Sequence, residues 1–525
     1  MALTKMIWGL GIVLVVALGT RVIGLGEYPV SLGIDEVANA YNAYSILTTG
    51  RDEWGVTLPL AMRSFNDYKA PLNIYMIVPS IKLLGKTEAA VRLPTAVFGA
   101  LTALVWMVWV RRLGIGRWAV LASGLGLALL PWHIHYSRGT FEAVTALFLV
   151  ILGLSMWQKK KTGWMAGAGV MLGLAMWTYH AQRVFVPLLL VWMVAMLRNI
   201  LGFVIALMVV AAPLVILGMT TPAIRTRAMA TSFLQENSLV KILHHGDYKS
   251  MAERIWDNDW YLIYRHGLGK YLNYFDVRYW YWNGLHLSLP GYPDMGLMYL
   301  AELPVWMLGV WALSQGKYRR LAPWVVMWGL AWVVPAAMTM NEQHSLRALV
   351  WWPFFGLITA VGYNQLKLKT QNSKFKRYLV LGWVGLWVIN LAFFYHMYTN
   401  QTWKWLSEYW QYPYKQVSMY ACDIKDKYRN VFLSEAFGDT DQLTSSPQLY
   451  LAWYCGGRTE DYVGTTAGKI MVKRPYWPAD KKEYGNSLFI AAPWDFGKGK
   501  LGDKEIVNKW YFLNGKLAFV AVETE

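Results

Sequence analysis

Long stretches of uncharged, apolar residues recur along this chain, and they constrain its fold more than any other feature. Several run for about 17 to 20 residues, and a helix of that length can cross a hydrocarbon layer about 30 Å thick. Apolar residues make up 56% of the 525 residues, and charged residues only 16%. The sequence therefore predicts a polytopic α-helical membrane protein. It excludes a soluble enzyme, a disordered chain and a disulfide-rich secreted domain.

Eleven stretches are predicted to span the membrane. The first covers about residues 6–24; it follows Lys5 and lacks a small-residue cleavage site, so we interpret it as an uncleaved signal anchor. The other predicted spans cover residues 94–110, 118–136, 141–157, 164–180, 184–197, 201–220, 296–313, 321–340, 346–363 and 378–398.

The formal net charge of +18 is concentrated in the short connections between these spans. Together with Lys5, one set of connections holds 16 Lys and Arg residues and no Asp or Glu. Positive residues are retained on the cytoplasmic side, so we expect the N-terminus inside and the C-terminus outside, in a bacterial plasma membrane. The basic excess is thus a topology signal, and no nucleic-acid partner is expected.

The apolar stretch at residues 71–84 is too short to span the membrane. A crossing there would also move every later basic loop to the outer side. We interpret it as an interfacial or re-entrant helix on the outer side. The predicted membrane domain then covers residues 1–398, with outer loops at about residues 25–93 and 221–295. The second loop is rich in Trp and Tyr, which favours helices lying on the membrane surface.

Residues 399–525 alternate short β-like runs with charged, turn-rich segments, which predicts a small extracytoplasmic α/β domain. Both cysteines of the chain, Cys422 and Cys455, lie in it. An oxidising exterior permits a disulfide between them, and two buried free thiols are the alternative.

Asp35 and Glu36 follow the first span and are the first candidates for chemistry. A carboxylate at the outer surface can take a proton from an acceptor hydroxyl. The residues after Glu36 are helix-compatible, so Asp35 as a simple helix N-cap is the alternative.

Fixed cations lie on the same predicted side of the membrane. Lys69, which precedes the interfacial helix, can snorkel to the interface or bind a phosphate. Arg138 and Glu142 are four residues apart, so they either pair on one helical face or bind substrate. Arg183 and Arg347 each begin an inward-going span, and their planar guanidinium groups suit phosphate oxygens.

The remaining substrate-binding candidates are Tyr68, His180, His286, Glu302 and His344. Glu302 lies within a predicted span, where an ionisable side chain is costly and therefore suggests a function. Lone histidines near membranes are more often hydrogen-bonded fillers than ligands. No HExxH, paired CxxC or P-loop motif occurs, so a divalent metal cofactor stays open.

Taken in order, these motifs resemble polyprenyl-phosphate-dependent glycosyltransferases of the GT-C fold, the group of protein O-mannosyltransferases and lipid A aminoarabinose transferases. The resemblance covers most of residues 1–360 and rests on short motifs. These motifs are Asp35-Glu36, Tyr68-Lys69-Ala70-Pro71-Leu72, Val91-Arg92-Leu93-Pro94, Ser137-Arg138 with Glu142, Tyr179-His180 with Arg183, and His344-Ser345-Leu346-Arg347.

The resemblance implies the transfer of one sugar from a polyprenyl-phosphate donor to a hydroxyl on a protein, lipid or glycan acceptor. It implies Asp35 as the base with Glu36 in support, and Lys69, Arg138, Arg183 and Arg347 as candidates to hold the donor phosphate. Glu142 stands where many relatives carry an Asp at the active site, so the resemblance implies that Glu142 is a third catalytic candidate. Tyr68 stands where the aminoarabinose enzymes carry a metal-binding carboxylate. A single displacement implies inversion at the anomeric carbon.

Two other classes of function compete with this hypothesis. A transporter or flippase for a lipid-linked or anionic substrate would also need many spans and buried charge, although matched internal repeats are not evident. A receptor or assembly protein would use residues 399–525 as its binding module. The sequence indicates neither the sugar nor the acceptor.

Overall fold

The computed structural model describes residues 2–64, 67–196, 200–221, 229, 231–243, 246–284, 295–340, 343–366, 373–438, 445–464, 468–497 and 506–525. Two compact units are present. The first comprises Met1–Ile23, Leu60–Asn73 and Thr95–Phe394. The second comprises Gly24–Pro59, Ile74–Pro94 and Tyr395–Glu525.

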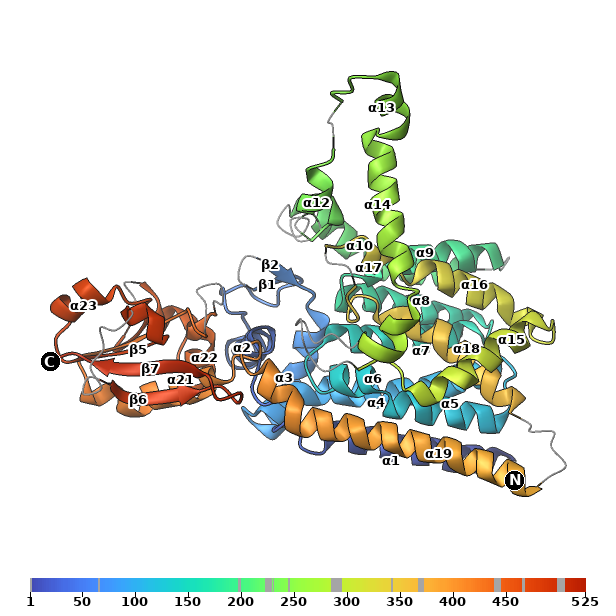
Figure 1. Cartoon of the computed structure of the whole chain (residues 1–525), viewed down its shortest axis with the longest axis horizontal. Helices are drawn as coiled ribbons and strands as arrows, with labels where there is room; N and C mark the ends of the chain where they lie inside the picture. The colour runs from blue at the N-terminus through green and yellow to red at the C-terminus, as the bar shows by residue number, and fades with distance from the viewer. Residues whose placement is uncertain are drawn as a thin grey trace. The chain divides into compact units, whose positions relative to one another are not determined.

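The first unit is built mainly from apolar helices (Figure 1). They are α1 (Ala2–Val22), most of α4 (Glu88–Arg112), α5 (Arg117–Leu129), α6 (Pro131–Ser137), α7 (Glu142–Trp157), α8 (Thr162–Thr178), α9 (Gln182–Met196), α10 (Leu201–Thr220), α15 (Leu303–Ser314), α16 (Ala322–Ala331), α17 (Val334–Ala337), α18 (Trp352–Gln365) and most of α19 (Ser373–His396).

Small residues allow these helices to approach closely. A Cβ atom on Gly169 of α8 would lie 2.3 Å from the carbonyl oxygen of Phe203 in α10. A Cβ on Gly309 of α15 would lie 2.0 Å from the carbonyl oxygen of Ile358 in α18. Such contacts are typical of helices that pack within a membrane, where backbone proximity replaces the hydrophobic drive between helices.

The eleven predicted spans all contain helix, but the lengths differ from the prediction. Among the described residues, four helical stretches are long and apolar enough to cross a membrane. They are Glu88–Arg112, Leu201–Thr220, Arg319–Ala337 and Val380–Leu406. A fifth span results if α5 and α6, which meet at a bend of 55°, count as one. Apolar helices of 10–17 residues include Glu142–Trp157, Gln182–Ala195 and Leu300–Ser314.

Shorter elements of the first unit lie in its connections. They are β1 (Met62–Ser64), β2 (Asp67–Lys69), η1 (Phe233–Gln235), α12 (Asn237–Val240), α13 (Met251–Trp256), α14 (Asp259–Asn273), η2 (Tyr279–Asn283), η3 (Leu300–Glu302), η4 (Arg319–Leu321) and η5 (Leu349–Trp351). The helices expected within residues 221–295 are therefore present.

Helix α14 projects from the rest of the first unit and runs across the direction of α1 and α19 (Figure 1). Its exposed side carries Trp260, Tyr264, Leu268 and Leu272 at four-residue spacing, with Trp260 83% exposed. Two polar side chains of the helix turn inward: His266 and Lys270 both bind Glu236. An apolar stripe turned outward suits a lipid surface, as expected for a helix lying on the membrane.

The second unit contains α2 (Ile34–Thr49), most of α3 (Leu72–Leu84), the first turns of α4 and a five-stranded mixed sheet. The strands are β3 (Asn430–Leu433), β4 (Ile470–Val472), β5 (Ser487–Ala491), β6 (Ile506–Tyr511) and β7 (Leu517–Glu523), in the order β4-β3-β5-β7-β6. Strand β3 pairs in parallel with β4 and β5, and β7 pairs antiparallel with β5 and β6.

The remaining elements of the second unit are helical. They are η6 (Met397–Gln401), α20 (Thr402–Leu406), α21 (Pro413–Ile424), η7 (Lys425–Lys427), α22 (Pro447–Tyr454), η8 (Thr459–Tyr462), α23 (Trp477–Glu483) and η10 (Pro493–Phe496). One side of the sheet buries Phe432 and Phe489, stacked at 4.5 Å, beside Trp477. Cys422 and Cys455 form a disulfide between α21 and the end of α22, which decides the open question about these thiols.

We predict that α14 rests on the membrane surface with its stripe toward lipid. In reconstituted protein, a spin label at Tyr264→Cys should be more accessible to oxygen and less accessible to a water-soluble nickel relaxant than one at Gly269→Cys. Gly269 is a matched control because it is exposed on the same helix and a Cβ atom there meets open space. Equal accessibility at the two positions would contradict the prediction.

Candidate active site

The first turn of α2 carries the two carboxylates that follow the first span. The helix begins at Ile34 with Gly33 as its N-cap, so Asp35 is not the N-cap residue, and that alternative is wrong. Both carboxylates lie instead in the first turn, where the helix dipole favours negative charge. Asp35 is exposed, whereas Glu36 is buried.

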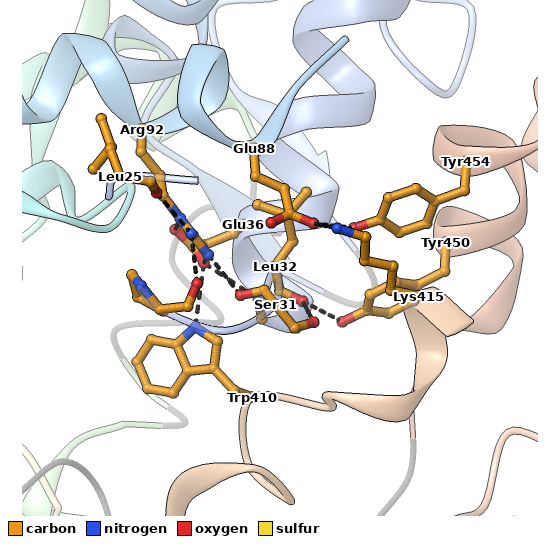
Figure 2. A network of polar contacts seen from close by, with 12 residues as sticks. Leu25, Ser31, Leu32, Glu36, Glu88, Arg92, Trp410, Lys415, Tyr450 and Tyr454 are labelled. Carbon is orange, nitrogen blue, oxygen red and sulfur yellow. Dashed lines mark hydrogen bonds and ion pairs between the residues drawn. The ribbon is translucent and has the colours of Figure 1, made fainter. Parts of the chain in front are cut away.

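Glu36 forms a two-pronged ion pair with Arg92 of α4 (Figure 2). The Arg92 Nε donates to Glu36 Oε1 at 3.1 Å, and Nη2 donates to Oε2 at 2.9 Å. The Arg92 side chain is fully buried, and that of Glu36 is 6% exposed. A guanidinium held in this fork geometry fixes the orientation of the carboxylate as well as its position.

Arg92 also holds the chain that leads into α2. Its Nη1 donates to the carbonyls of Leu25 and Pro29 at 3.2 and 2.8 Å, and its Nη2 donates to the carbonyl of Ser31 at 2.6 Å. Glu36 in turn accepts hydrogen bonds from the Gly33 N–H and from Trp410 Nε1, both at 3.3 Å. The buried pair thus fixes the start of α2, and Asp35 is presented at the surface beside it.

Further contacts tie α21 and α22 to the same region of the second unit. Glu88, one turn before Arg92, accepts from Lys415 Nζ at 2.8 Å and from Tyr454 Oη at 2.9 Å (Figure 2). Tyr450 Oη donates to the carbonyl of Leu32 at 2.9 Å. Burial and the nearby Glu88 carboxylate raise the pKa of Tyr454 well above its usual value, so its hydroxyl remains a donor.

In the first unit, Tyr68 and Lys69 lie on β2, which pairs with β1 through Met62↔Lys69. Lys69 is buried, which differs from a lysine that snorkels to solvent, and Tyr68 is half-buried. Four residues later, Asn73 binds the start of α7: its Nδ2 donates to the Thr140 carbonyl at 3.2 Å, and its Oδ1 accepts from Thr145 at 3.3 Å. These bonds bring the Lys69 segment to the segment of Arg138 and Glu142.

Arg138 and Glu142 do not share a helical face, so that part of the pairing hypothesis is wrong. Arg138 is the C-cap of α6, and Glu142 is the first residue of α7. The Arg138 Nη1 donates to the carbonyls of Thr20, Arg21 and Ile23 at 3.2, 3.1 and 2.8 Å. Arg138 therefore caps the C-terminal end of α1, where a cation is favoured by the helix dipole.

The segment of His344 and Arg347 adjoins the same part of the first unit. The hydroxyl oxygen of Tyr136, two residues before Arg138, lies 2.5 Å from Ser345 Oγ. The His344 N–H donates to Tyr274 Oη at 2.9 Å, and Arg347 Nη1 donates to the Met340 carbonyl at 3.0 Å. Burial raises the pKa of Tyr274 to about 12.

Other predicted residues lie elsewhere in the first unit. Arg183 is half-buried in the first turn of α9, and its Nε donates to the Met176 carbonyl at 3.3 Å; His180 is half-buried just before that helix. Glu302 is buried and accepts from Tyr363 Oη at 2.5 Å. His286 lies outside the described residues.

Two buried arginines were not recognised as important from the sequence. Arg92 appears in the sequence-based prediction only as part of the motif Val91-Arg92-Leu93-Pro94, with no role assigned, and Arg21 does not appear. Arg21 is fully buried and donates to the Ala128 carbonyl at 2.9 Å and to His133 Nδ1 at 2.8 Å. The available signal was a guanidinium within or at the end of an otherwise apolar helix, which requires a buried partner.

The part of the chain that the structure describes contains no group of three His, Cys, Asp or Glu side chains close enough to hold a metal ion.

Comparison with known proteins adds independent evidence on the fold. The structure of ArnT from Cupriavidus metallidurans bound to undecaprenyl phosphate aligns over 99% of this chain and 97% of its own, with 14% identity and a TM-score of 0.52. The chain has a GT-C fold. The apo oligosaccharyltransferase of Archaeoglobus fulgidus aligns over 93% of this chain and 69% of its own, with 11% identity and a TM-score of 0.51.

The family model described as dolichyl-phosphate-mannose-protein mannosyltransferase matches residues 68–220. This segment includes Lys69, Arg138, Glu142, His180 and Arg183. Comparison with curated protein sequences gave no match. The resemblance that the motifs predicted is therefore confirmed by the family model over this segment and by the fold over nearly the whole chain.

We expect Arg92→Met to destabilise the protein strongly. Removing one partner of a buried ion pair leaves the other charge uncompensated and typically costs about 3–5 kcal/mol in the free energy of unfolding. Thermal unfolding of the purified protein in detergent would measure this loss. Arg51→Met, which removes an exposed arginine of the same unit, is the control. Equal unfolding temperatures for the two variants would contradict the structural role of Arg92.

We also expect His344 to make stability depend on pH. Burial and the nearby Arg347 lower the pKa of His344 from 6.5 to about 4. The unfolded chain takes up this proton first as the pH falls, so the stabilisation is present above pH 6.5 and is lost towards pH 4. The unfolding temperature should therefore drop more between pH 7 and pH 5 in the wild type than in His344→Gln. The same drop in both proteins would show that His344 does not contribute.

Proposed function

We propose that this protein is a membrane glycosyltransferase that moves one sugar from a polyprenyl-phosphate donor to an acceptor hydroxyl on the outer side of the membrane. The fold and the family match over residues 68–220 support a transferase that uses a lipid-linked sugar. The membrane topology predicted from the sequence supports a site on the outer side. The basic connections mark the cytoplasmic ends of the spans, and the candidate residues lie at the other ends.

We assign different roles to Asp35 and Glu36 because Glu36 is buried and Asp35 is exposed. Glu36 has both carboxylate oxygens bound by Arg92, and its Oε2 is also bound by Gly33 and Trp410, so it is a positioning residue. Asp35 lies next to it on a fixed helical turn with an exposed side chain. A carboxylate that is held in place and open to an incoming molecule meets the geometric requirement for a general base.

Cations to bind the donor phosphate come from the first unit. Hydrogen bonds join the segments of Lys69, Arg138 and Arg347 through the Asn73–Thr140 and Tyr136–Ser345 contacts. We assign these three residues and Arg183 to the donor phosphate. Glu142 is assigned to the catalytic group with Asp35 and Glu36. Five residues are assigned to binding of the sugar or the acceptor: Tyr68, His180, His286, Glu302 and His344.

The proposed reaction is a single displacement. Asp35 takes the proton of the acceptor hydroxyl while that oxygen forms a bond to the anomeric carbon. The bond from the anomeric carbon to the phosphate oxygen breaks, and polyprenyl phosphate leaves with its electron pair. Fixed cations stabilise the charge on the departing phosphate, so a strong general acid is not required. Displacement from one face inverts the anomeric centre.

Asp35→Asn should reduce transfer by about 10²–10⁴-fold, the usual contribution of a positioned base, while expression and folding are preserved. The assay incubates purified protein with a panel of polyprenyl-phosphate sugars and identifies products by mass spectrometry.

Asp423→Asn is the matched control, because it removes an exposed carboxylate from α21 of the same unit. An Asp35→Asn protein that transfers at the wild-type rate would exclude Asp35 as the base. Transport of a solute by reconstituted protein with no sugar transfer from any donor would exclude the proposed activity as a whole.

A further inference from the structure

A cavity of about 560 Å³ in the first unit is remote in sequence from the motifs discussed above. The end of α4, the turn between α7 and α8, and α16 line it. Its polar side chains are Arg112, Gln158, Lys159 and Lys160, and its aromatic side chains are Trp157 and Trp324. By the charge rule that sets the topology, this end of the helices faces the cytoplasm.

The cations of the cavity have no nearby carboxylate in the surrounding sequence. Residues 111–117, 158–162 and 314–322, which form the turns here, contain nine basic residues and no Asp or Glu. Arg112 is anchored, because its Nη1 donates to the Ser155 carbonyl. Lys159 and Lys160 are exposed. Three positive side chains around one cavity therefore select an anionic ligand, and their phosphate affinity follows from charge and donor geometry.

Gln158 adds neutral hydrogen-bonding groups to the same cavity. Its amide nitrogen and oxygen are both shielded from solvent and have no hydrogen-bond partner among the described residues. Buried polar atoms are normally paired, and leaving them unpaired costs about 1–3 kcal/mol each. Because neither amide atom is accessible, Gln158 does not itself select the ligand, and the cations and the aromatic rings determine what the cavity can bind.

The aromatic side of the cavity fits the boundary between headgroups and acyl chains. The rings of Trp157 and Trp324 pack edge to face with centroids 5.6 Å apart, and both residues are buried. Tryptophan is enriched at this depth because its ring is apolar and its N–H is polar. The cations of the cavity thus suit a phosphate, and its indole rings suit the neighbouring part of a lipid molecule.

We infer that this cavity binds the phosphate-bearing headgroup of an anionic phospholipid of the cytoplasmic leaflet. Basic residues that only set the membrane topology have to lie on the cytoplasmic side, but they do not have to surround a cavity. Any lysine on that side could replace another, whereas a binding site depends on the lysines that line it. The site lies at the end of the helices opposite to the proposed donor site in the predicted topology. It therefore does not depend on the proposed sugar transfer.

The test measures lipid binding by thermal unfolding of the delipidated full-length protein in a neutral detergent. Phosphatidylglycerol, phosphatidylcholine and inorganic phosphate are titrated separately. Lys159→Gln/Lys160→Gln removes two cations that line the cavity, and Arg117→Gln/Lys161→Gln removes two exposed cations from the neighbouring turns that do not line it. Both variants lose the same net charge. Gln158→Leu removes the amide without a change in charge.

Phosphatidylglycerol should stabilise the wild type. Its apparent affinity should fall roughly 30-fold in Lys159→Gln/Lys160→Gln, since each basic residue near an anionic lipid surface contributes about 1 kcal/mol, or about fivefold. The control pair and Gln158→Leu should retain the wild-type affinity. Equal weakening in both charge variants would show a diffuse surface effect. Equal stabilisation by phosphatidylcholine or by inorganic phosphate would contradict an anionic lipid site.

Discussion

The buried ion pair between Glu36 and Arg92 is the interaction on which the proposed active site depends. Charges that leave water need compensation, and here the guanidinium satisfies the carboxylate and three backbone carbonyls at once. A pair of this kind adds little net stability over an apolar contact, but it penalises every other arrangement of its partners. The pair therefore fixes the path of residues 25–33 and the start of α2. In this way it also fixes the position of Asp35.

In the first unit, too, polar contacts between segments far apart in the sequence fix the candidate residues, but most of these contacts are hydrogen bonds and not ion pairs. Asn73 joins the β-hairpin segment to α7, Tyr136 joins the end of α6 to the His344 loop, and Arg138 caps α1. Each contact uses a polar group at a helix end or loop, where backbone groups lack partners within the helix. Fewer bonds of this kind join the helix bodies, such as those from Trp106 to Ser123 and from Trp177 to the Val210 carbonyl. Ionic side chains that are far apart in the sequence are thus collected at the helix ends.

The sequence was sufficient to predict the helices, because apolar length and the alternation of basic turns are local signals. It also indicated the GT-C fold through Asp35-Glu36, Tyr68-Lys69 and the later Arg motifs. It did not indicate the partner of Arg92, since Glu36 is 56 residues away and no local pattern connects them. The helix start at Gly33–Ile34 and the separation of Arg138 from Glu142 by a helix break depend on tertiary contacts for the same reason.

The most direct test of this account is a double-mutant cycle on the transfer rate with Asp35→Asn, Arg92→Lys and the double variant. Arg92→Lys keeps the charge but loses the fork that binds Glu36 and the carbonyls. If the ion pair acts by positioning Asp35, Arg92→Lys lowers kcat, and the double variant is no slower than Asp35→Asn alone. An unchanged kcat in Arg92→Lys, or losses that multiply in the double variant, would contradict the account.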